Sequence, residues 1–476
     1  MGWQGDWAGL RVAVLGVGAS GFSAVDTLVE LGCDVKVFAK KVEAEYLEIL
    51  EVLSVPVTKS DQVQNFKDSS WIPELAIVSP GFPPTQELVQ ELTSLGVPLW
   101  TDIDLAWNLR DKVQVAKWVT ITGTNGKTTT TELTAEMLRA AGHKVAACGN
   151  IGNPILDAVR DPEGFDYLVV ELSSFQLHYM QEISAVASAF LNLAHDHIDW
   201  HGSYEEYGKA KAKIYQNTQI ACVYNAADPV TEKFLEEADV VEGCRAIGFT
   251  AGNPAISMVG YVEDILVDRA FLQNRQNEAL EIAKLEDYRG IGVVSPHLMQ
   301  NMAAATALAR ACDVSPQEIA SALQNFKLAP HRIELVGEFS GVQYVDDSKA
   351  TNVHAARASL RSFDKVVWIC GGLLKGVDPA PLVKEFASKL SAAIVIGADT
   401  SAFQDLFAKL APQVPIHVMP NTSNVMQLAV EKASEIAQPG ETVLLAPAAA
   451  SMDQFRDYAD RGDKFKLAVN LIGGAK

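Results

Sequence analysis

The segment from Trp118 to Thr130 constrains the fold of this chain more than any other, because an apolar β-branched run leads into a glycine-flanked loop and then a helical pattern. The loop reads Gly123-Thr-Asn-Gly-Lys-Thr128. Backbone N–H groups of such a loop can surround phosphate oxygens, while a lysine neutralises their charge and a threonine hydroxyl holds Mg²⁺. Ile121 stands where the longer form of this pattern has its first glycine. The segment therefore predicts a nucleoside triphosphate site of the shorter form.

A glycine-rich turn near the N-terminus predicts a second ligand-binding unit. Residues 10–39 read as strand, Gly16-x-Gly18-x-x-Gly21 turn, helix and strand, which is a βαβ unit of Rossmann type. A nicotinamide cofactor is disfavoured, because Ala39 stands where an acidic ribose ligand is expected. Lys40 and Lys41 follow it, and they fit either a phosphate-bearing ligand or solvated surface charge.

A second loop belongs to the same unit. The apolar run 75–78 predicts a strand, and Ser79, Pro80 and Gly81 follow it directly. Loops at the carboxyl ends of parallel strands line the ligand crevices of open α/β sheets. The two loops together therefore predict one binding crevice.

Acidic and histidine residues follow the next strands. Residues 166–171 read as a buried parallel strand that ends in Glu171, which is placed to reach Mg²⁺ beside a phosphate loop. Residues 190–193 read as another strand, and the segment 195–201 after it contains three histidines and two aspartates. This density predicts a metal or phosphate role in a loop. Mg²⁺ is favoured over zinc, because the helical H-E-x-x-H spacing is absent.

The alternation of strands and helices resumes after residue 330. Apolar runs at 366–372, 392–397, 415–418 and 442–445 predict the strands of a further parallel sheet. The predicted fold is α/β with three domains: a Rossmann-like domain over 1–107, a central phosphate-loop domain with a mainly parallel sheet over 108–329, and a Rossmann-like domain over 330–476.

Composition narrows the partners. The 476 residues are 48% hydrophobic and 21% charged, which is typical of a globular protein with large cores. The net charge of −20 argues against sequence-independent nucleic-acid binding and favours small-molecule partners. Six scattered cysteines, no apolar run of membrane-spanning length and no secretory signal pattern predict a cytoplasmic protein without membrane insertion. We expect a monomer.

Taken in order, the motifs resemble those of the Mur ligase family over essentially the whole chain. They are Gly123–Thr129, Gly149-Asn-Ile-Gly152, Glu171-Leu-Ser-Ser-Phe-Gln-Leu177, Asp196-His-x-Asp199, Lys211-x-Lys-Ile-Tyr215, His297-x-x-x-Asn301, Pro330-His-Arg332, Asp347-Ser-Lys-Ala-Thr-Asn352 and Ser451-Met-Asp-Gln-Phe455. The strings that begin at Glu171 and Asp347 are similar to those of the D-glutamate-adding branch. The resemblance implies an ATP-dependent amide ligase of peptidoglycan precursor synthesis, with UDP-N-acetylmuramoyl-L-alanine and D-glutamate as substrates.

The resemblance also implies roles for individual residues. Lys127, His197 and Lys211 would be catalytic, with a CO₂-derived carbamate on Lys211. Two Mg²⁺ ions would be held by Thr128, Glu171, His197 and the carbamate. ATP would contact Gly123, Thr124, Asn125, Gly126, Lys127, Thr128, Thr129, Asn301, Arg332 and Asp347. The other substrates would contact Gly18, Ala19, Ser20, Ser79, Pro80, Gly81, Asn150, Gln176, Lys349, Thr351, Ser451, Met452 and Tyr458.

Three alternatives remain at this point. Another amide ligase of the same architecture is one, but the Asp-Asn-Pro-Arg string of the diaminopimelate-adding enzyme is missing, and Lys127 precedes threonine rather than the Gly-Ser of folylpolyglutamate ligases. A phosphate-loop switch would not need the polar motifs after residue 330. A dinucleotide oxidoreductase rests only on the Gly16–Gly21 turn.

Overall fold

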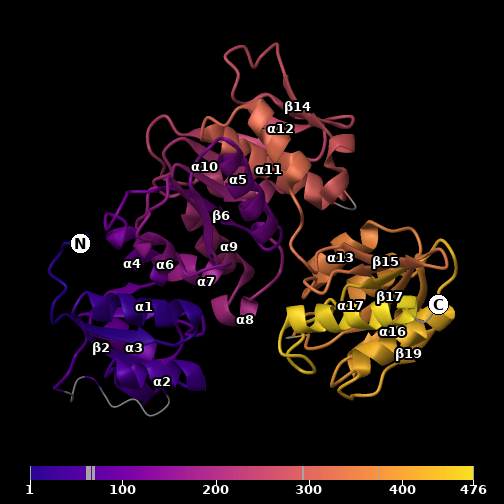
Figure 1. Cartoon of the computed structure of the whole chain (residues 1–476), viewed down its shortest axis with the longest axis horizontal. Coiled ribbons are helices and arrows are strands. Elements are labelled where there is room, and N and C mark those ends of the chain that lie inside the picture. The colour runs from indigo at the N-terminus through magenta and orange to yellow at the C-terminus, as the bar shows by residue number, and fades with distance from the viewer. Residues whose placement is uncertain (1, 61–65, 67–69, 292–293, 375, 475–476) are drawn as a thin grey trace. The chain divides into compact units, whose positions relative to one another are not determined.

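The computed structural model describes residues 2–60, 66, 70–291, 294–374 and 376–474. The described chain divides into two compact units. The larger comprises residues 1–287 and 299–324, and the smaller comprises 288–298 and 325–476. The described strands form three sheets, two in the larger unit and one in the smaller (Figure 1). The predicted α/β class with three parallel-rich regions is confirmed.

The first sheet is parallel, in the order β3-β2-β1-β4-β5. Helix α1 crosses from β1 to β2, and the order reverses between β1 and β4, which is the point where open α/β sheets bind ligands. Both predicted loops begin there, and the Ser79 hydroxyl donates to the Gly16 carbonyl at 3.2 Å. The elements are β1 (Arg11–Leu15), α1 (Ala19–Glu30), β2 (Asp34–Ala39), α2 (Ala44–Val52), β3 (Val57–Lys59), β4 (Leu75–Val78), α3 (Glu87–Ser94), β5 (Leu99–Trp100) and α4 (Asp102–Leu109).

The second sheet has the order β14-β13-β12-β11-β10-β9-β6-β8-β7. It is parallel from β7 to β12, and β12, β13 and β14 are antiparallel. Its strands are β6 (Lys117–Thr122), β7 (Val145–Gly149), β8 (Tyr167–Glu171), β9 (Ala187–Phe190), β10 (Ala221–Asn225), β11 (Arg245–Phe249), β12 (Met258–Val262), β13 (Ile265–Asp268) and β14 (Leu280–Lys284). Its helices are α5 (Lys127–Ala140), α6 (Ile155–Arg160), α7 (Ser174–Tyr179), α8 (Ile198–His201), α9 (Tyr204–Ala212), α10 (Pro229–Glu236), α11 (Pro296–Ala311) and α12 (Pro316–Asn325).

One prediction about this sheet is wrong in position. The strand expected at 190–193 is β9, which runs from Ala187 to Phe190. Residues 191–193 are the first residues after it, although Leu191 and Leu193 are buried. Burial of a loop against the sheet produces the same apolar pattern as a strand, and periodicity cannot separate the two.

The first two sheets share one hydrophobic core. Helices α1, α4 and α6 pack together, and strand residues of both sheets, among them Val12 and Trp118, belong to the same buried cluster. Charged groups reinforce the contact, since Arg160 on α6 pairs with Asp26 at 2.7 Å and Glu30 at 2.8 Å on α1. The continuous core explains why two sheets make one compact unit.

The third sheet has the order β15-β16-β20-β17-β18-β19, parallel except for the β15–β16 pair. Val366, Trp368 and Cys370 of β17 face helices α13, α14 and α15, while Val367 and Ile369 face α16 and α17. The elements are β15 (Glu334–Phe339), β16 (Val342–Asp346), α13 (Val353–Arg361), β17 (Val366–Gly371), α14 (Ala380–Phe386), β18 (Leu390–Ile396), α15 (Ser401–Leu410), β19 (Ile416–Val418), α16 (Val425–Ile436), β20 (Thr442–Leu445) and α17 (Tyr458–Gly474). This three-layer arrangement explains the continuous apolar runs, because both faces of a central strand are buried.

Gly462 allows α17 to approach this sheet. A Cβ atom at that position would collide with Nδ1 of His331 and approach Asp346. We expect Gly462→Ala to destabilise the smaller unit by about 1–3 kcal/mol, the usual cost of overpacking. Hydrogen exchange of peptides from α17 and β16 measures this. Gly474→Ala in the same helix is the matched control, because a Cβ there meets nothing within 4 Å. Equal protection in the two variants would contradict the prediction.

Candidate active site

The phosphate loop is built at the carboxyl end of β6, at the start of α5. Gly126 has φ +83° and lies against the Asn301 side-chain amide of α11, so a Cβ atom would be both strained and obstructed. Asn192, just after β9, clamps the loop. It accepts from the Asn125 N–H at 2.9 Å and donates to the Asn125 carbonyl at 3.0 Å. These contacts fix the backbone of Asn125 within the loop.

Two lysines meet at this loop. Lys127 Nζ donates to the carbonyls of Gly123 at 2.9 Å and Thr124 at 3.0 Å. Lys211 Nζ, from α9, donates to the same Gly123 carbonyl at 2.8 Å and to the Thr122 hydroxyl at 3.3 Å. Lys211 is 2% exposed, and burial, reinforced by the Lys127 charge, holds its pKa well below the usual value. The protonated form of Lys211 is therefore less favourable than that of an exposed lysine.

Glu171 at the end of β8 has one occupied and one free carboxylate oxygen. Its Oε1 accepts from the Asn150 side-chain amide at 2.8 Å. Its Oε2 is buried and has no hydrogen-bond partner. A buried carboxylate oxygen without a partner costs free energy unless a cation or donor meets it. Such an oxygen is the ligand type that Mg²⁺ prefers, so Glu171 fits the predicted metal role.

The histidine-rich segment after β9 does not converge on one point. Among the described residues, its side chains form no set of three metal-ligating atoms within 4.8 Å. His195 stacks on Tyr204 at 4.5 Å, His197 meets the Phe175 ring edge at 4.7 Å, and His201 lies parallel to Phe175 at 5.8 Å. The expected loop is also partly helical, because 198–201 form α8. The rings of this segment therefore contact neighbouring aromatic side chains, while His195, His197 and Asp199 remain exposed, and the His197 side chain is 42% exposed beside Asp196.

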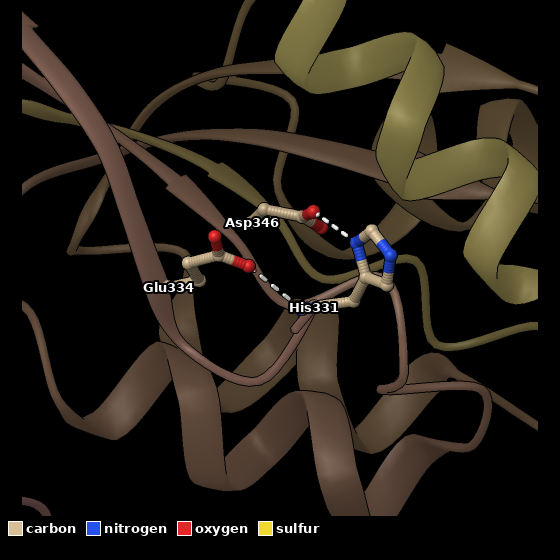
Figure 2. Close-up of side chains that lie close together, drawn as sticks. All are labelled: His331, Glu334 and Asp346. Atoms are coloured by element: carbon tan, nitrogen blue, oxygen red, sulfur yellow. Dashed lines mark hydrogen bonds and ion pairs between the residues drawn. The ribbon is translucent and has the colours of Figure 1, made fainter. Parts of the chain in front are cut away.

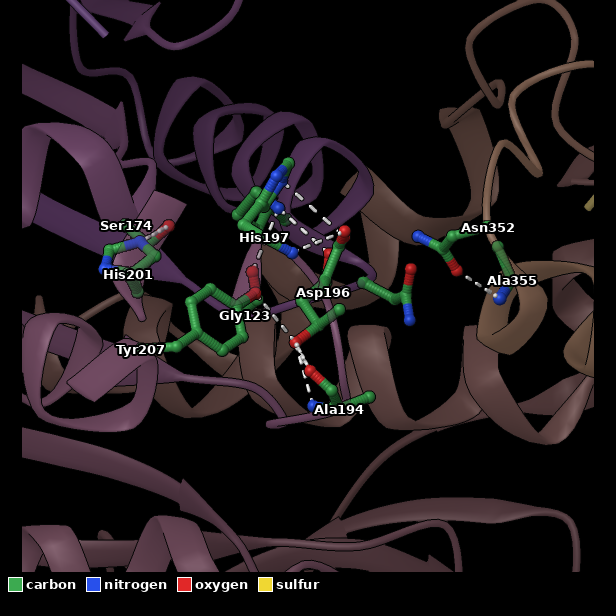
Figure 3. A network of polar contacts seen from close by, with 12 residues as sticks. Gly123, Ser174, Ala194, Asp196, His197, His201, Tyr207, Asn352 and Ala355 are labelled. Carbon is green, nitrogen blue, oxygen red and sulfur yellow. Dashed lines mark hydrogen bonds and ion pairs between the residues drawn. The ribbon is translucent and has the colours of Figure 1, made fainter. Parts of the chain in front are cut away.

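Figure 3 shows His201 and Tyr207 from this part of the larger unit. The Tyr207 hydroxyl lies 3.1 Å from the Thr124 hydroxyl, and its ring lies 5.0 Å below Lys211 Nζ. His201 Nε2 is 3.0 Å from the Ser174 hydroxyl, while its Nδ1 is buried without a partner. Sequence reasoning missed Tyr207 and Asn192. A polar residue at the end of an apolar run was the available signal for Asn192, and no sequence pattern marked Tyr207.

Gln176, predicted to contact substrate, is fully engaged within the protein. Its Oε1 accepts from the Ser173 N–H at 3.1 Å and hydroxyl at 3.0 Å, closing a capping box at the start of α7. Its Nε2 donates to Asp102 at 3.2 Å. Asn150 is likewise joined to Glu171, although it is exposed. Gly18, Ala19 and Ser20 begin α1, and Ser79, Pro80 and Gly81 follow β4.

The smaller unit holds the other predicted residues at the end of β16. Asp347 is buried, and this raises its pKa to about 6, while it accepts from the Ser359 hydroxyl and from the Ile333 N–H at 3.3 Å. Lys349 Nζ lies 3.8 Å from the centre of the Tyr458 ring. Arg461, a buried arginine that sequence reasoning missed, donates to Ser348 and to the Ala449 carbonyl, two residues before Ser451. Arg332, Thr351 and Ser451 lie in the loops around these groups, and Met452 is 71% exposed.

A hydrogen-bonded His–Asp pair lies among these loops. His331 Nδ1 lies 2.6 Å from Asp346 Oδ2, and the His331 N–H donates to Glu334 at 2.9 Å (Figure 2). Among the described residues, these three side chains are the group with metal-type ligand atoms within 4.8 Å of one another. Each already has a hydrogen-bond partner inside the protein, so the arrangement is explained as a buried His–Asp pair that fixes residues 330–332 against β16.

Two protein-family models match the parts of the chain that carry these residues. Residues 121–309 match the Mur ligase middle domain, and residues 331–449 match the glutamate ligase domain of Mur ligases. The chain is 50% identical to the UDP-N-acetylmuramoylalanine–D-glutamate ligase of Leifsonia xyli, across 99% of this chain and 95% of the relative.

The chain belongs to the Mur ligase family. It is also 45% identical to the ligase of the same name from Streptomyces coelicolor, across 98% of this chain and 99% of the relative. Its fold is similar to that of the UDP-N-acetylmuramate–alanine ligase of Thermotoga maritima, with a TM-score of 0.56, 16% identity, and coverage of 98% of this chain and 100% of that one. Membership in the Mur ligases implies ATP and Mg²⁺ use, which the phosphate loop and the free oxygen of Glu171 fit. Among the described residues, no helix is long and apolar enough to cross a membrane.

His201 supplies a pH prediction. Burial, followed by the nearby charges of His178 and His197, lowers its pKa to about 4. The unfolded chain binds a proton at this residue below about pH 6.5, whereas the folded chain does so only near pH 4. The stability contributed by neutral His201 is therefore full above pH 6.5 and is lost as the pH falls through that window. NMR titration of the ring protons checks this, with His201→Asn used for assignment. A titration midpoint near 6.5 would contradict it.

Proposed function

We propose that this chain joins D-glutamate to UDP-N-acetylmuramoyl-L-alanine in an ATP-dependent amide ligation, with an acyl phosphate as intermediate. The observation that carries the proposal is the 50% identity, over nearly the whole chain, to a relative named for that activity. The clamped phosphate loop, the two lysines at Gly123 and the free oxygen of Glu171 support it. The reaction belongs to peptidoglycan precursor synthesis. A cytoplasmic location and a monomeric state remain predictions from the sequence.

The proposed chemistry gives Lys127 a role in neutralising negative charge. A carboxylate is a poor acylating agent, so its oxygen first attacks the γ-phosphorus of ATP and expels ADP. The amine of D-glutamate then attacks the acyl phosphate, forms the amide and expels phosphate. Lys127 would offset the repulsion between the carboxylate and the triphosphate, and the loop N–H groups would hold the phosphate oxygens. Bound Mg²⁺ ions supply further charge neutralisation, with Thr128 and Glu171 holding the first and His197 the second in this proposal.

Lys211 would take part as a carbamate. Its neutral amine would attack CO₂, form an N–C bond and release a proton, turning a cation into an anion. The carboxylate oxygens would then face the second Mg²⁺ together with His197. One feature supports this proposal: Lys211 is buried beside Lys127, and both burial and the Lys127 charge lower its pKa, which favours the amine form that reacts with CO₂. A fixed anion would balance Lys127 better than a second ammonium group.

The residues after 330 would bind the incoming amino acid and part of the nucleotide. Arg332 and Asp347 would contact the nucleotide, and Lys349, Thr351, Ser451, Met452 and Tyr458 would contact D-glutamate. The loops that carry them are joined by Arg461 and by the His331–Asp346 pair. The Gly18–Ser20 turn and the Ser79–Gly81 loop would bind the UDP portion of the other substrate, and Asn150 and Gln176 its muramoyl-alanine portion. The boundaries at 107 and 329 remain predictions.

Measuring phosphate release and product mass tests the activity. With ATP, Mg²⁺ and UDP-N-acetylmuramoyl-L-alanine, we expect release with D-glutamate and a product heavier by one glutamyl residue. L-glutamate, L-lysine and diaminopimelate are the matched amino acids, and none of them should be joined. Product with one of these instead would assign the chain to a sister ligase. Phosphate release without any amino acid would favour a nucleotide-hydrolysing switch.

Replacing Lys211 with Ala tests the carbamate. The variant should lose activity by about a hundredfold or more, because a metal ligand and a fixed charge disappear together. Short carboxylic acids should restore part of the activity by occupying the vacated space. Lys209→Ala is the control, since Lys209 lies on the same helix, exposed and paired with Glu205 and Glu206. Full activity of the unrescued Lys211→Ala variant would exclude the carbamate.

A further inference from the structure

Helix α4 carries two buried carboxylates in its first turn, outside all of the predicted ligand-binding sets. Asp102 is 5% exposed and Asp104 is 2% exposed. Burial raises the pKa of both groups, that of Asp104 to about 6. Burying a carboxylate costs free energy that only hydrogen bonds or charges can offset. The partners of each carboxylate therefore indicate why it is there.

Asp104 is explained by local structure. Its Oδ2 accepts from the Thr101 N–H at 2.7 Å and from the Thr101 hydroxyl at 2.8 Å, which completes the capping box of α4. Its Oδ1 accepts from the Gln181 N–H at 2.6 Å, just beyond α7. Asp104 thus caps the start of α4 and holds the backbone just beyond the end of α7.

Asp102 has partners of a different kind. Because Thr101 and Asp104 already cap α4, the cap does not require Asp102. Its oxygens accept from Gln176 Nε2 at 3.2 and 3.5 Å. Burial raises the pKa of the Asp102 carboxyl, and the nearby Ser20 hydroxyl and Ile103 backbone, together with Gln176, oppose that rise. Ser20 lies in the first turn of α1, between Gly18 and Gly21 of the glycine-rich turn. Gln176 lies in the first turn of α7.

The carbonyl end of the Gln176 side chain contacts the turn that follows Glu171. Its Oε1 holds the Ser173 N–H and hydroxyl, and Ser173 is two residues beyond Glu171. The sequence of contacts therefore runs from Ser20 through Asp102 and Gln176 to the turn that follows Glu171. Every residue in it belongs to the larger compact unit.

We propose that Asp102 is a positioning residue, which holds the glycine-rich turn of the first sheet at a fixed distance from the Glu171 end of β8. The inference rests on the proposed function, because these two places would bind opposite ends of the same UDP-linked substrate. Without Asp102, the turn that binds the UDP portion would no longer be aligned with the place where the carboxylate reacts. Recognition of the UDP-linked substrate should weaken, while the phosphate loop, which Asp102 does not contact, should bind ATP as before.

A comparison of Asp102→Ala with Asp104→Ala tests this inference, because both variants remove a buried carboxylate from the same helix turn. We expect Asp102→Ala to raise the KM for UDP-N-acetylmuramoyl-L-alanine about tenfold, the effect of losing a few hydrogen bonds, with the KM for ATP unchanged. Asp104→Ala should lower the unfolding temperature at least as much and leave both KM values unchanged. Equal KM changes in the two variants, or no change in Asp102→Ala, would overturn the inference.

A second variant keeps the test sharp if the alanine variant folds poorly. Asp102→Asn can still accept from Gln176 through Oδ1 and donate to the Ser20 hydroxyl through Nδ2, so it should recover most of the lost affinity. The double variant Asp102→Ala and Ser20→Ala should raise the KM for UDP-N-acetylmuramoyl-L-alanine by less than the two single changes combined, because each single change removes the same Asp102–Ser20 contact. Additive effects would count against the inference. Wild-type protein that neither binds nor consumes the UDP-linked substrate in calorimetry would instead refute the proposed function itself.

Discussion

The Gly123 carbonyl oxygen accepts hydrogen bonds from two lysines, and the arrangement of the larger unit around its phosphate loop depends on this contact. Lys127 comes from the loop itself, whereas Lys211 comes from α9, more than eighty residues later. Two ammonium groups at one oxygen repel each other, and the repulsion adds to the effect of burial on Lys211. Under the proposed function, phosphate groups or a carbamate would offset this repulsion.

The neighbouring groups suit that electrostatic situation. Glu171 presents a buried carboxylate oxygen without a partner, and Asn150 fixes the other oxygen. The aromatic cluster of Phe175, Trp200, His201 and Tyr207 covers this region with groups that stay uncharged near neutral pH, since burial holds the pKa of His201 at about 4. A site that is partly shielded from water strengthens every charge interaction within it.

Much of the fold and part of the site could be predicted from local patterns. The strands β1, β2, β4, β6, β8 and β17 to β20 carry apolar runs whose length and turn residues identify them. The antiparallel strands β12, β14 and β15 carry mixed, partly exposed residues, and no pattern separated them from loops. The apolar run at 190–193 was misplaced because loop residues buried against the sheet look like a strand.

The sequence by itself determined the phosphate loop, the acid at the end of β8 and the family, because the chemistry of each depends on residue types at short, fixed spacing. Only the tertiary structure decided what lies beside them. It placed Lys211 on the Gly123 carbonyl, Asn192 on Asn125, and Asp102 between Ser20 and Gln176. The three hydrogen-bonded pairs Asn125–Asn192, Asp102–Gln176 and Gly123–Lys211 are between 67 and 88 residues apart in the sequence. Such contacts arise from the order of strands in a sheet and from helix packing, which local spacing does not encode.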